Sequence, residues 1–194
     1  MEKLTRENLF SLEKYAEVRS DFRAQVMAHK RDRRLALGPN ATLYFEDRLT
    51  MQYQVQEMLR IERIFEAAGI TEELDAYNPL IPDGNNWKAT FMVEFPDVDE
   101  RRVMLGRLVG IEDRVWMQVG EFEKLRPIAD QDLERDTEDK TSAVHFLQFD
   151  LPQEQIAALK EGASLSAGID HENYSAEVRP VPDNLRTSLL KDLD

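Results

Sequence analysis

The chain has 194 residues, of which 38 are acidic and 25 are basic, so its formal net charge at pH 7 is −13. A surface this acidic repels nucleic acids and anionic lipids, and we expect neither as a general partner. The absence of cysteine excludes disulfides, thiolate nucleophiles and iron–sulfur clusters held by cysteine. No apolar run approaches the roughly 18 residues of a membrane span, and the polar N-terminus lacks a secretory signal, so we expect a cytoplasmic protein that does not enter the membrane.

The length of the chain allows one domain or two small lobes, because a chain of this size can bury a sizeable core. We treat residues 1–194 as a single α+β domain. A helical sub-lobe over 1–82 and a sheet-rich sub-lobe over 83–194 are the alternative division. The stretch 130–139 holds six acidic residues and one arginine with almost no apolar content, which predicts a solvated acidic loop.

The first part of the chain is predicted to be mainly helical. Helical periodicity runs from about residue 11 to 33 and again from about 48 to 68. Between these helices, 35–46 reads as a hairpin around Gly38-Pro39-Asn40. A short third helix starts near residue 71 and ends before the Asn-Pro pair at 78–79.

The later part alternates strands with short helices. The predicted strands are 87–95, 115–119, 122–126, 143–149, 164–170 and 174–178. The predicted helices are 97–109, 152–161 and a short terminal one after Pro182.

Hairpins outnumber β–α–β units, which favours an α+β fold. We expect two long N-terminal helices, joined by the hairpin, to pack on a mainly antiparallel sheet from the C-terminal two thirds. The two helices should contact each other through five apolar side chains: Phe22, Val26, Val55, Met58 and Phe65.

All three histidines fall on faces that periodicity predicts to be buried. His29 lies on the apolar stripe of the first helix, whereas His145 and His171 alternate with apolar residues in strands. Imidazole is the commonest metal ligand and the usual acid or base near neutral pH. One interpretation is three separate, hydrogen-bonded core histidines. The other brings His145 and His171 together with Glu57 as a site for zinc, iron or manganese.

The second helix carries polar side chains inside its apolar arc, namely Gln54, Glu57 and Glu62. Buried charged groups need partners, so we expect each carboxylate to be paired. The candidate partners come from the first helix and its end: Arg19, Arg23, His29 and Arg33. Structural salt bridges are one interpretation, and a carboxylate, imidazole and amide site between the helices is the other.

A basic segment ends the first predicted helix, where residues 29–34 read His-Lys-Arg-Asp-Arg-Arg. Such a segment could hold phosphate or an acidic partner. It could equally complement the negative end of its own helix dipole.

Several motifs spread over nearly the whole chain resemble one bacterial family. They are His29-Lys30 with Arg33-Arg34, Phe45-Glu46, the stretch Gln-x-x-Glu-Met-Leu-Arg-x-Glu at 54–62, Tyr77-Asn78-Pro79-Leu80, and Asp170-His171 with Tyr174. The family is catalogued only as a domain of unknown function. The resemblance therefore implies a single unit of about this size without an established activity.

The resemblance also implies a biological context. Genes of the family lie near those of rubrerythrin-like and iron–sulfur oxidoreductases, which points to a redox or oxidative-stress role with a redox protein as partner. A homodimer is a further expectation. The residues singled out for binding are His29, Arg33, Arg34, Gln54, Glu57, Glu62, Tyr77, Asn78 and Tyr174.

Two functions of different class follow from the sequence. The first is a non-catalytic accessory or binding protein whose inward polar groups order a binding surface. The second is a histidine and carboxylate metal protein, or a metal-dependent enzyme. The common nucleotide-binding, metalloprotease and serine-hydrolase motifs are absent from the sequence, so no motif decides between the two.

Overall fold

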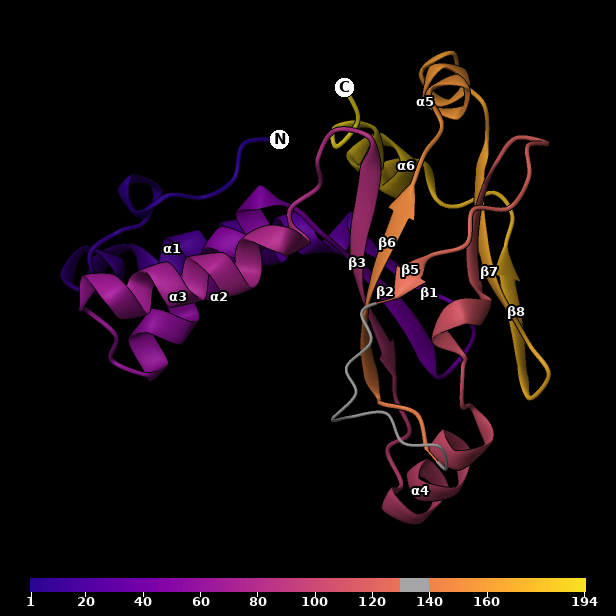
Figure 1. Cartoon of the computed structure of the whole chain (residues 1–194), viewed down its shortest axis with the longest axis horizontal. Coiled ribbons are helices and arrows are strands. Elements are labelled where there is room, and N and C mark those ends of the chain that lie inside the picture. Colours follow the sequence, from indigo (N-terminus) through magenta and orange to yellow (C-terminus); the bar gives the residue numbers. More distant parts are fainter. Residues whose placement is uncertain (130–139) are drawn as a thin grey trace.

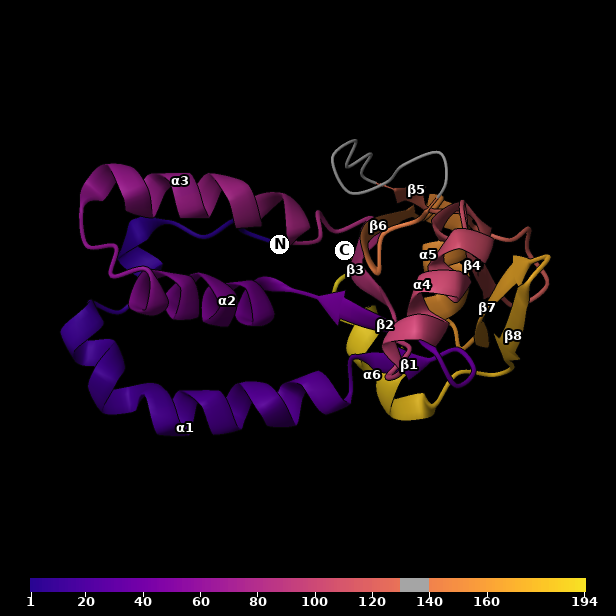
Figure 2. The same cartoon turned by 90° about the horizontal axis from the view of Figure 1, so that it is seen from below.

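The computed structural model describes residues 1–129 and 140–194, which form a helical arm and a body built on two sheets (Figure 1). The arm consists of α1 (Leu12–Arg31), α2 (Arg48–Ile61) and α3 (Ala67–Tyr77), which lie side by side (Figure 2). The predicted α+β class is confirmed. The predicted acidic loop at 130–139 lies outside the described residues.

The two long helices do not pack on the sheet, so that part of the prediction is wrong. The hairpin that joins them, β1 (Arg34–Ala36) and β2 (Ala41–Glu46), is itself built into the larger sheet. Both helices therefore leave the sheet from the open end of this hairpin and extend away from the body (Figure 2).

The predicted contact between α1 and α2 is present, but only part of the predicted apolar set is buried. Val26 and Val55 are completely buried, and Phe22 is half-buried. However, α2 ends at Ile61 and not near residue 68, because Arg63 adopts a left-handed backbone conformation with φ 56°. As a consequence Phe65 is 71% exposed, and its predicted place in the interface is wrong.

The larger sheet is antiparallel and has the strand order β1-β2-β3-β6-β5. Its remaining strands are β3 (Asn86–Val93), β5 (Ile128–Ala129) and β6 (Val144–Asp150). Side chains of successive residues in a strand point to opposite faces. One face of this sheet carries the core, and we call the opposite one the outer face.

The smaller sheet is antiparallel with the order β4-β7-β8, formed by β4 (Val115–Val119), β7 (Leu165–His171) and β8 (Tyr174–Val178). The expected strand at 122–126 is wrong. There the chain makes only an isolated bridge, in which the backbones of Met117 and Leu125 exchange two hydrogen bonds.

The main hydrophobic core lies between the two sheets and includes Phe45, Phe91 and Phe149 of the larger sheet with Val115 and Ile169 of the smaller one. The helices α4 (Val98–Arg107) and α5 (Gln153–Lys160) lie at opposite ends of the body (Figure 1). The last helix, α6 (Asp183–Leu190), contributes Leu185 and Leu189 to the same core.

A second, smaller hydrophobic cluster lies within the arm, around Val55, Leu59, Leu74 and Ile81. The two clusters do not divide the chain at residue 82, because β1 and β2 contribute to the core of the body. Among the described residues, no helix combines the length and the apolar character that crossing a membrane requires.

Candidate functional site

A cavity of about 570 Å³ lies where the arm meets the outer face of the larger sheet, and we call it the junction cavity. The lining comes from α1 and α2, from the end of α3 and from four strands of the larger sheet. The lining residues are Met27, Lys30, Arg31, Arg34, Tyr44, Glu46, Met51, Gln54, Tyr77, Leu80, Thr90, Met92 and Phe146.

Because side chains alternate along each strand, the sheet wall of the cavity carries both polar and apolar side chains. In β2, Leu43 and Phe45 point into the core, so Tyr44 and Glu46 point to the outer face. The register of the antiparallel pairs sets Tyr44 opposite Thr90 of β3. The sheet therefore supplies one wall of the cavity and the ends of the helices supply the other.

Three cationic side chains line the cavity where α1 passes into β1. Lys30 is half-buried, whereas Arg31 and Arg34 are exposed. The Arg34 guanidinium carbon lies 5.7 Å from the centre of the Tyr44 ring, within the range of a cation–π interaction. Within residues 1–129 and 140–194, none of the three forms an ion pair.

The cavity also contains a carboxylate on its sheet wall. Glu46 is 7% exposed, and its Oε1 accepts a hydrogen bond of 2.8 Å from the hydroxyl of Thr90. Arg34 pairs with Tyr44 in the register, so it is the diagonal neighbour of Glu46 across the two strands. The two charges nevertheless form no ion pair at 4.0 Å or less in the described structure.

Three of the predicted binding residues, Arg34, Gln54 and Tyr77, are brought together in the junction cavity. The other six do not line it, and each is accounted for below by its own contacts or by its exposure. The predicted set thus splits into one group around a cavity and several groups that hold the fold together.

His29 and Arg33 belong to a buried charge network at the base of the arm. His29 was predicted to be buried, but it is only half-buried. Its Nε2 lies 2.5 Å from Oδ2 of Asp47. Asp47 is the N-cap of α2, where its Oδ1 accepts the backbone N–H of Thr50. The network therefore ties the end of α1 to the start of α2.

Arg33 is the centre of this network and is only 2% exposed. Its Nη2 and Nη1 lie 2.5 and 3.3 Å from the two carboxylate oxygens of Asp192. It also donates to the backbone carbonyls of Phe45 and Glu46 at 3.0 and 3.1 Å. Burial raises the pKa of the Asp192 carboxyl to about 6, although the attraction of Arg33 offsets part of that effect.

Glu57 is paired, as predicted, and its partners belong to the arm. Arg19 donates to both carboxylate oxygens at 2.7 and 2.9 Å, and the hydroxyl of Tyr15 donates at 2.7 Å. The hydrogen bonds from Arg19 are the main reason why the pKa of Glu57 is lowered to about 2. These contacts favour the structural salt bridge over a site between the helices.

Glu62 does not follow the prediction. It is exposed just after the end of α2, and it forms no ion pair with any described residue. The physical reason is the same left-handed Arg63 that ends the helical periodicity. Glu62 therefore faces solvent and not an apolar arc.

Asn78 and Tyr174 fasten distant segments through backbone groups. The amide of Asn78 accepts from the N–H of Leu4 at 2.8 Å and donates to its carbonyl at 2.9 Å. The hydroxyl of Tyr174 donates to the carbonyl of Leu37 at 2.7 Å and accepts from the N–H of Asn40 at 3.1 Å. Both side chains are used to hold the fold.

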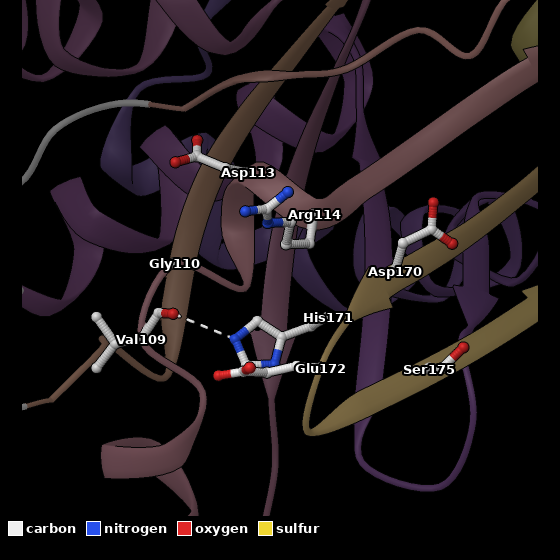
Figure 3. Close-up of a pocket in the computed structure, with 8 residues that line it drawn as sticks. All are labelled: Val109, Gly110, Asp113, Arg114, Asp170, His171, Glu172 and Ser175. Carbon is white, nitrogen blue, oxygen red and sulfur yellow. Dashed lines mark hydrogen bonds between the residues drawn. The ribbon is translucent and has the colours of Figure 1, made fainter.

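A second cavity, of about 630 Å³, lies beside the turn between β7 and β8 and contains His171 (Figure 3). The Nδ1 atom of His171 accepts the N–H of Asn173, so its Nε2 carries the proton that is donated to the carbonyl of Val109 at 3.2 Å. In Figure 3 the ring points toward Val109. Both nitrogens are thus engaged in neutral hydrogen bonds.

His145 is buried in the main core and lies 3.0 Å from the carbonyl of Ser142 through Nε2. The same nitrogen lies 3.1 Å from the hydroxyl of Thr141. The ring also lies at an angle beside Phe91, with 6.1 Å between the ring centres. The burial of His145 and His171 predicted from strand alternation is confirmed.

The structure does not bring His145, His171 and Glu57 together. The two histidines lie on strands of different sheets, and Glu57 lies on α2 in the arm. In residues 1–129 and 140–194, no three histidine, aspartate or glutamate side chains converge closely enough to hold a metal ion. The two histidines do not meet because β6 and β7 join separate sheets.

Comparison with known proteins identifies the family. Residues 3–193 match the model of a protein family that is described as protein of unknown function, DUF3501. The chain belongs to this family. Another protein of unknown function, from Burkholderia pseudomallei K96243, has a crystal structure that is similar over 100% of both chains, with 50% identity and a TM-score of 0.93. A comparison with curated proteins finds no match. The predicted resemblance is confirmed.

Sequence reasoning missed most of the lining of the junction cavity in this DUF3501 chain. Tyr44, Thr90 and Met92 come from two strands, and Phe146 comes from a third. One signal was present: Tyr44 and Glu46 alternate with the apolar residues Leu43 and Phe45. Alternation identifies a shared face, but it does not show that the ends of two helices cover it.

Proposed function

We propose that the protein is a non-catalytic accessory protein that binds a small molecule in the junction cavity. The observation that carries the proposal is the cavity itself. Its volume of about 570 Å³ falls within the range of about 300–1,000 Å³ that is usual for ligand sites. Apolar side chains and a few polar groups line it together, which is also typical of such sites.

The arrangement of polar groups supports binding over catalysis. The cavity lining contains no histidine, and the buried carboxylate, Glu46, has a threonine hydroxyl and no imidazole as its partner. In the described part of the chain His29, His145 and His171 are all engaged by other groups. The Thr90 hydroxyl donates directly to the Glu46 carboxylate, without the imidazole base that stands between hydroxyl and carboxylate in a catalytic triad.

The wider role follows from the family resemblance and from composition. We propose that the protein acts in the cytoplasm beside a redox protein, as an accessory component that carries no cysteine-bound cluster of its own. The bound small molecule would then be what the partner supplies or receives.

A neutral apolar fluorophore tests the proposed site without assuming the charge of the ligand. N-phenyl-1-naphthylamine should bind the protein saturably, because the apolar wall excludes water from the probe. The variant Gln54→Trp places a large ring in the cavity and should weaken binding at least tenfold. Gln25→Trp, on the exposed face of α1, is the matched control and should bind like the parent protein.

Circular dichroism and the unfolding temperature establish that both variants are folded. The proposal is contradicted if the parent protein does not bind the probe. It is equally contradicted if folded Gln54→Trp binds as well as Gln25→Trp.

A further inference from the structure

We infer that the junction cavity selects an anionic amphiphile, that is, a molecule in which one carboxylate or phosphate group is attached to an apolar body. This inference rests on the proposed function and adds the chemical class of the ligand. Two features of the lining carry it: cations that form no ion pair within the described part of the chain, and an adaptable apolar wall.

The first feature is the cationic edge formed by Lys30, Arg31 and Arg34. The chain has 38 acidic side chains. None of those that lie in the described residues forms an ion pair with these three cations. The neighbouring Arg33 shows the contrast, because it is buried and bonded to Asp192. Cations that form no ion pair with any described residue of an acidic protein, at the edge of a cavity, are groups that an anionic ligand would complement.

The dipole of α1 explains only part of the positive charge at this edge. Lys30 and Arg31 lie in the last turn of α1, where positive charge is favourable. Arg34 lies beyond the helix, as the first residue of β1, and points to the outer face of the sheet. Its guanidinium can donate two hydrogen bonds to one carboxylate or phosphate, which suits recognition of such groups.

The second feature is the apolar wall, which contains three methionines, Met27, Met51 and Met92, together with Leu80 and Phe146. Methionine is unbranched and polarizable, so it adapts to ligands of irregular shape. Met51 is 4% exposed, whereas the other four are half-buried and accessible from the cavity. An apolar body in contact with this wall would be removed from water, which is favourable.

Glu46 limits where the anionic group can lie. Its carboxylate is fixed on the sheet wall by Thr90 and would repel a second anion placed beside it. The lining therefore offers three cations at the edge against one carboxylate within. We conclude that the anionic group of the ligand lies at the edge, and that its apolar body extends along the methionines.

Displacement of N-phenyl-1-naphthylamine by amphiphiles with the same ten-carbon chain tests the inference. The probes are decanoate, decyl phosphate, decan-1-ol and decylamine at pH 7.5. We expect at least one of the two anions to displace the fluorophore at a concentration about tenfold lower than the alcohol and the amine. Decanoate and decyl phosphate together distinguish a carboxylate ligand from a phosphate ligand.

Two variants locate the selectivity. Arg34→Gln and Lys30→Gln should each weaken the better anion about two- to fivefold and leave the alcohol unchanged, which is the range expected for exposed charge pairs. Arg23→Gln removes the same charge from an exposed residue of α1 that does not line the cavity. It should leave all four probes unchanged.

The outcomes separate the inference from the proposed function. If the fluorophore binds but the alcohol or the amine competes as well as both anions, the inference is wrong and the binding site stands. If Arg23→Gln weakens the anion as much as Arg34→Gln, general charge explains the effect and the inference is also wrong. If the fluorophore does not bind, the proposed function fails with it.

Discussion

Arg33 and Asp192 are separated by 159 residues, yet they meet inside the protein with an Nη2–Oδ2 distance of 2.5 Å. Arg33 is 2% exposed and Asp192 is 1% exposed, so the pair is shielded from water. Arg33 also lies 3.4 Å from the carboxylate of Asp47, the N-cap of α2. One guanidinium thus joins the end of α1, the start of α2 and the C-terminal segment.

Replacing Arg33 with methionine should destabilise the protein by about 3–5 kcal/mol, because Asp192 would stay buried without its cation. Arg34→Met is the matched control: it is the next residue, it is exposed, and it should change stability by about 0.5 kcal/mol or less. Urea denaturation measures both values. Equal effects for the two variants would show that the buried pair does not stabilise the fold.

The Asp192 pair should also make stability depend on pH. Its pKa is raised from 3.8 to about 6, so between these values the folded state binds the proton more tightly than the unfolded state does. The contribution of Asp192 to stability therefore falls as pH rises from about 4 to 6, by up to roughly 3 kcal/mol.

Asp192→Asn removes that proton equilibrium. The free energy of unfolding of the parent protein minus that of the variant should therefore be larger at pH 4 than at pH 7. A difference that is constant over this range, or that increases with pH, would contradict the assignment. Chemical denaturation at a series of pH values provides the measurement.

Glu57 should show the opposite pH dependence. Its pKa is lowered from 4.5 to about 2, so its contribution is fully present above about pH 4.5 and is lost as pH falls toward 2. Glu57→Gln should cost about 1–3 kcal/mol at pH 7, because Arg19 and Tyr15 lose a charged acceptor. The exposed Glu62→Gln is the control and should have almost no effect. If both substitutions are neutral, the arm does not depend on this ion pair.

Gly38 should be irreplaceable for two reasons that can be separated. Its φ is +76°, and an added Cβ would lie 2.6 Å from the hydroxyl oxygen of Tyr174. Gly110 has a similar φ of +79° but open space around its Cβ position. Gly110→Ala should therefore cost about 1–2 kcal/mol for backbone conformation alone, and Gly38→Ala should cost clearly more. Thermal unfolding of the two variants tests this, and a smaller loss for Gly38→Ala would refute the steric contribution.

Local patterns predicted the elements of the fold better than their arrangement. The turn at Gly38-Pro39-Asn40, the burial of His145 and the pairing of Glu57 all follow from rules that act over short distances along the chain. The direction of the arm does not, because helical periodicity identifies an apolar face without identifying what covers it. The exposure of Phe65 was missed because the left-handed Arg63 carries no glycine signal in the sequence.

The candidate site was harder to predict for the same reason. Arg34, Gln54 and Tyr77 were identified one by one, but the cavity that joins them also requires Thr90 and Phe146 from later strands. Such a surface exists only after the order β1-β2-β3-β6 has formed. Pairings of this kind depend on strand register and on long-range contacts, which composition and periodicity do not specify.

A crystal structure of the protein with whichever of decanoate and decyl phosphate binds more tightly shows directly whether the junction cavity is a ligand site. We expect electron density for the anionic group within hydrogen-bonding distance of Arg34 or Lys30, and density for the alkyl chain along Met27 and Met92. Density for the molecule only outside the cavity would contradict the ligand site, and density with the anionic group away from the cationic edge would contradict the selection of an anionic amphiphile.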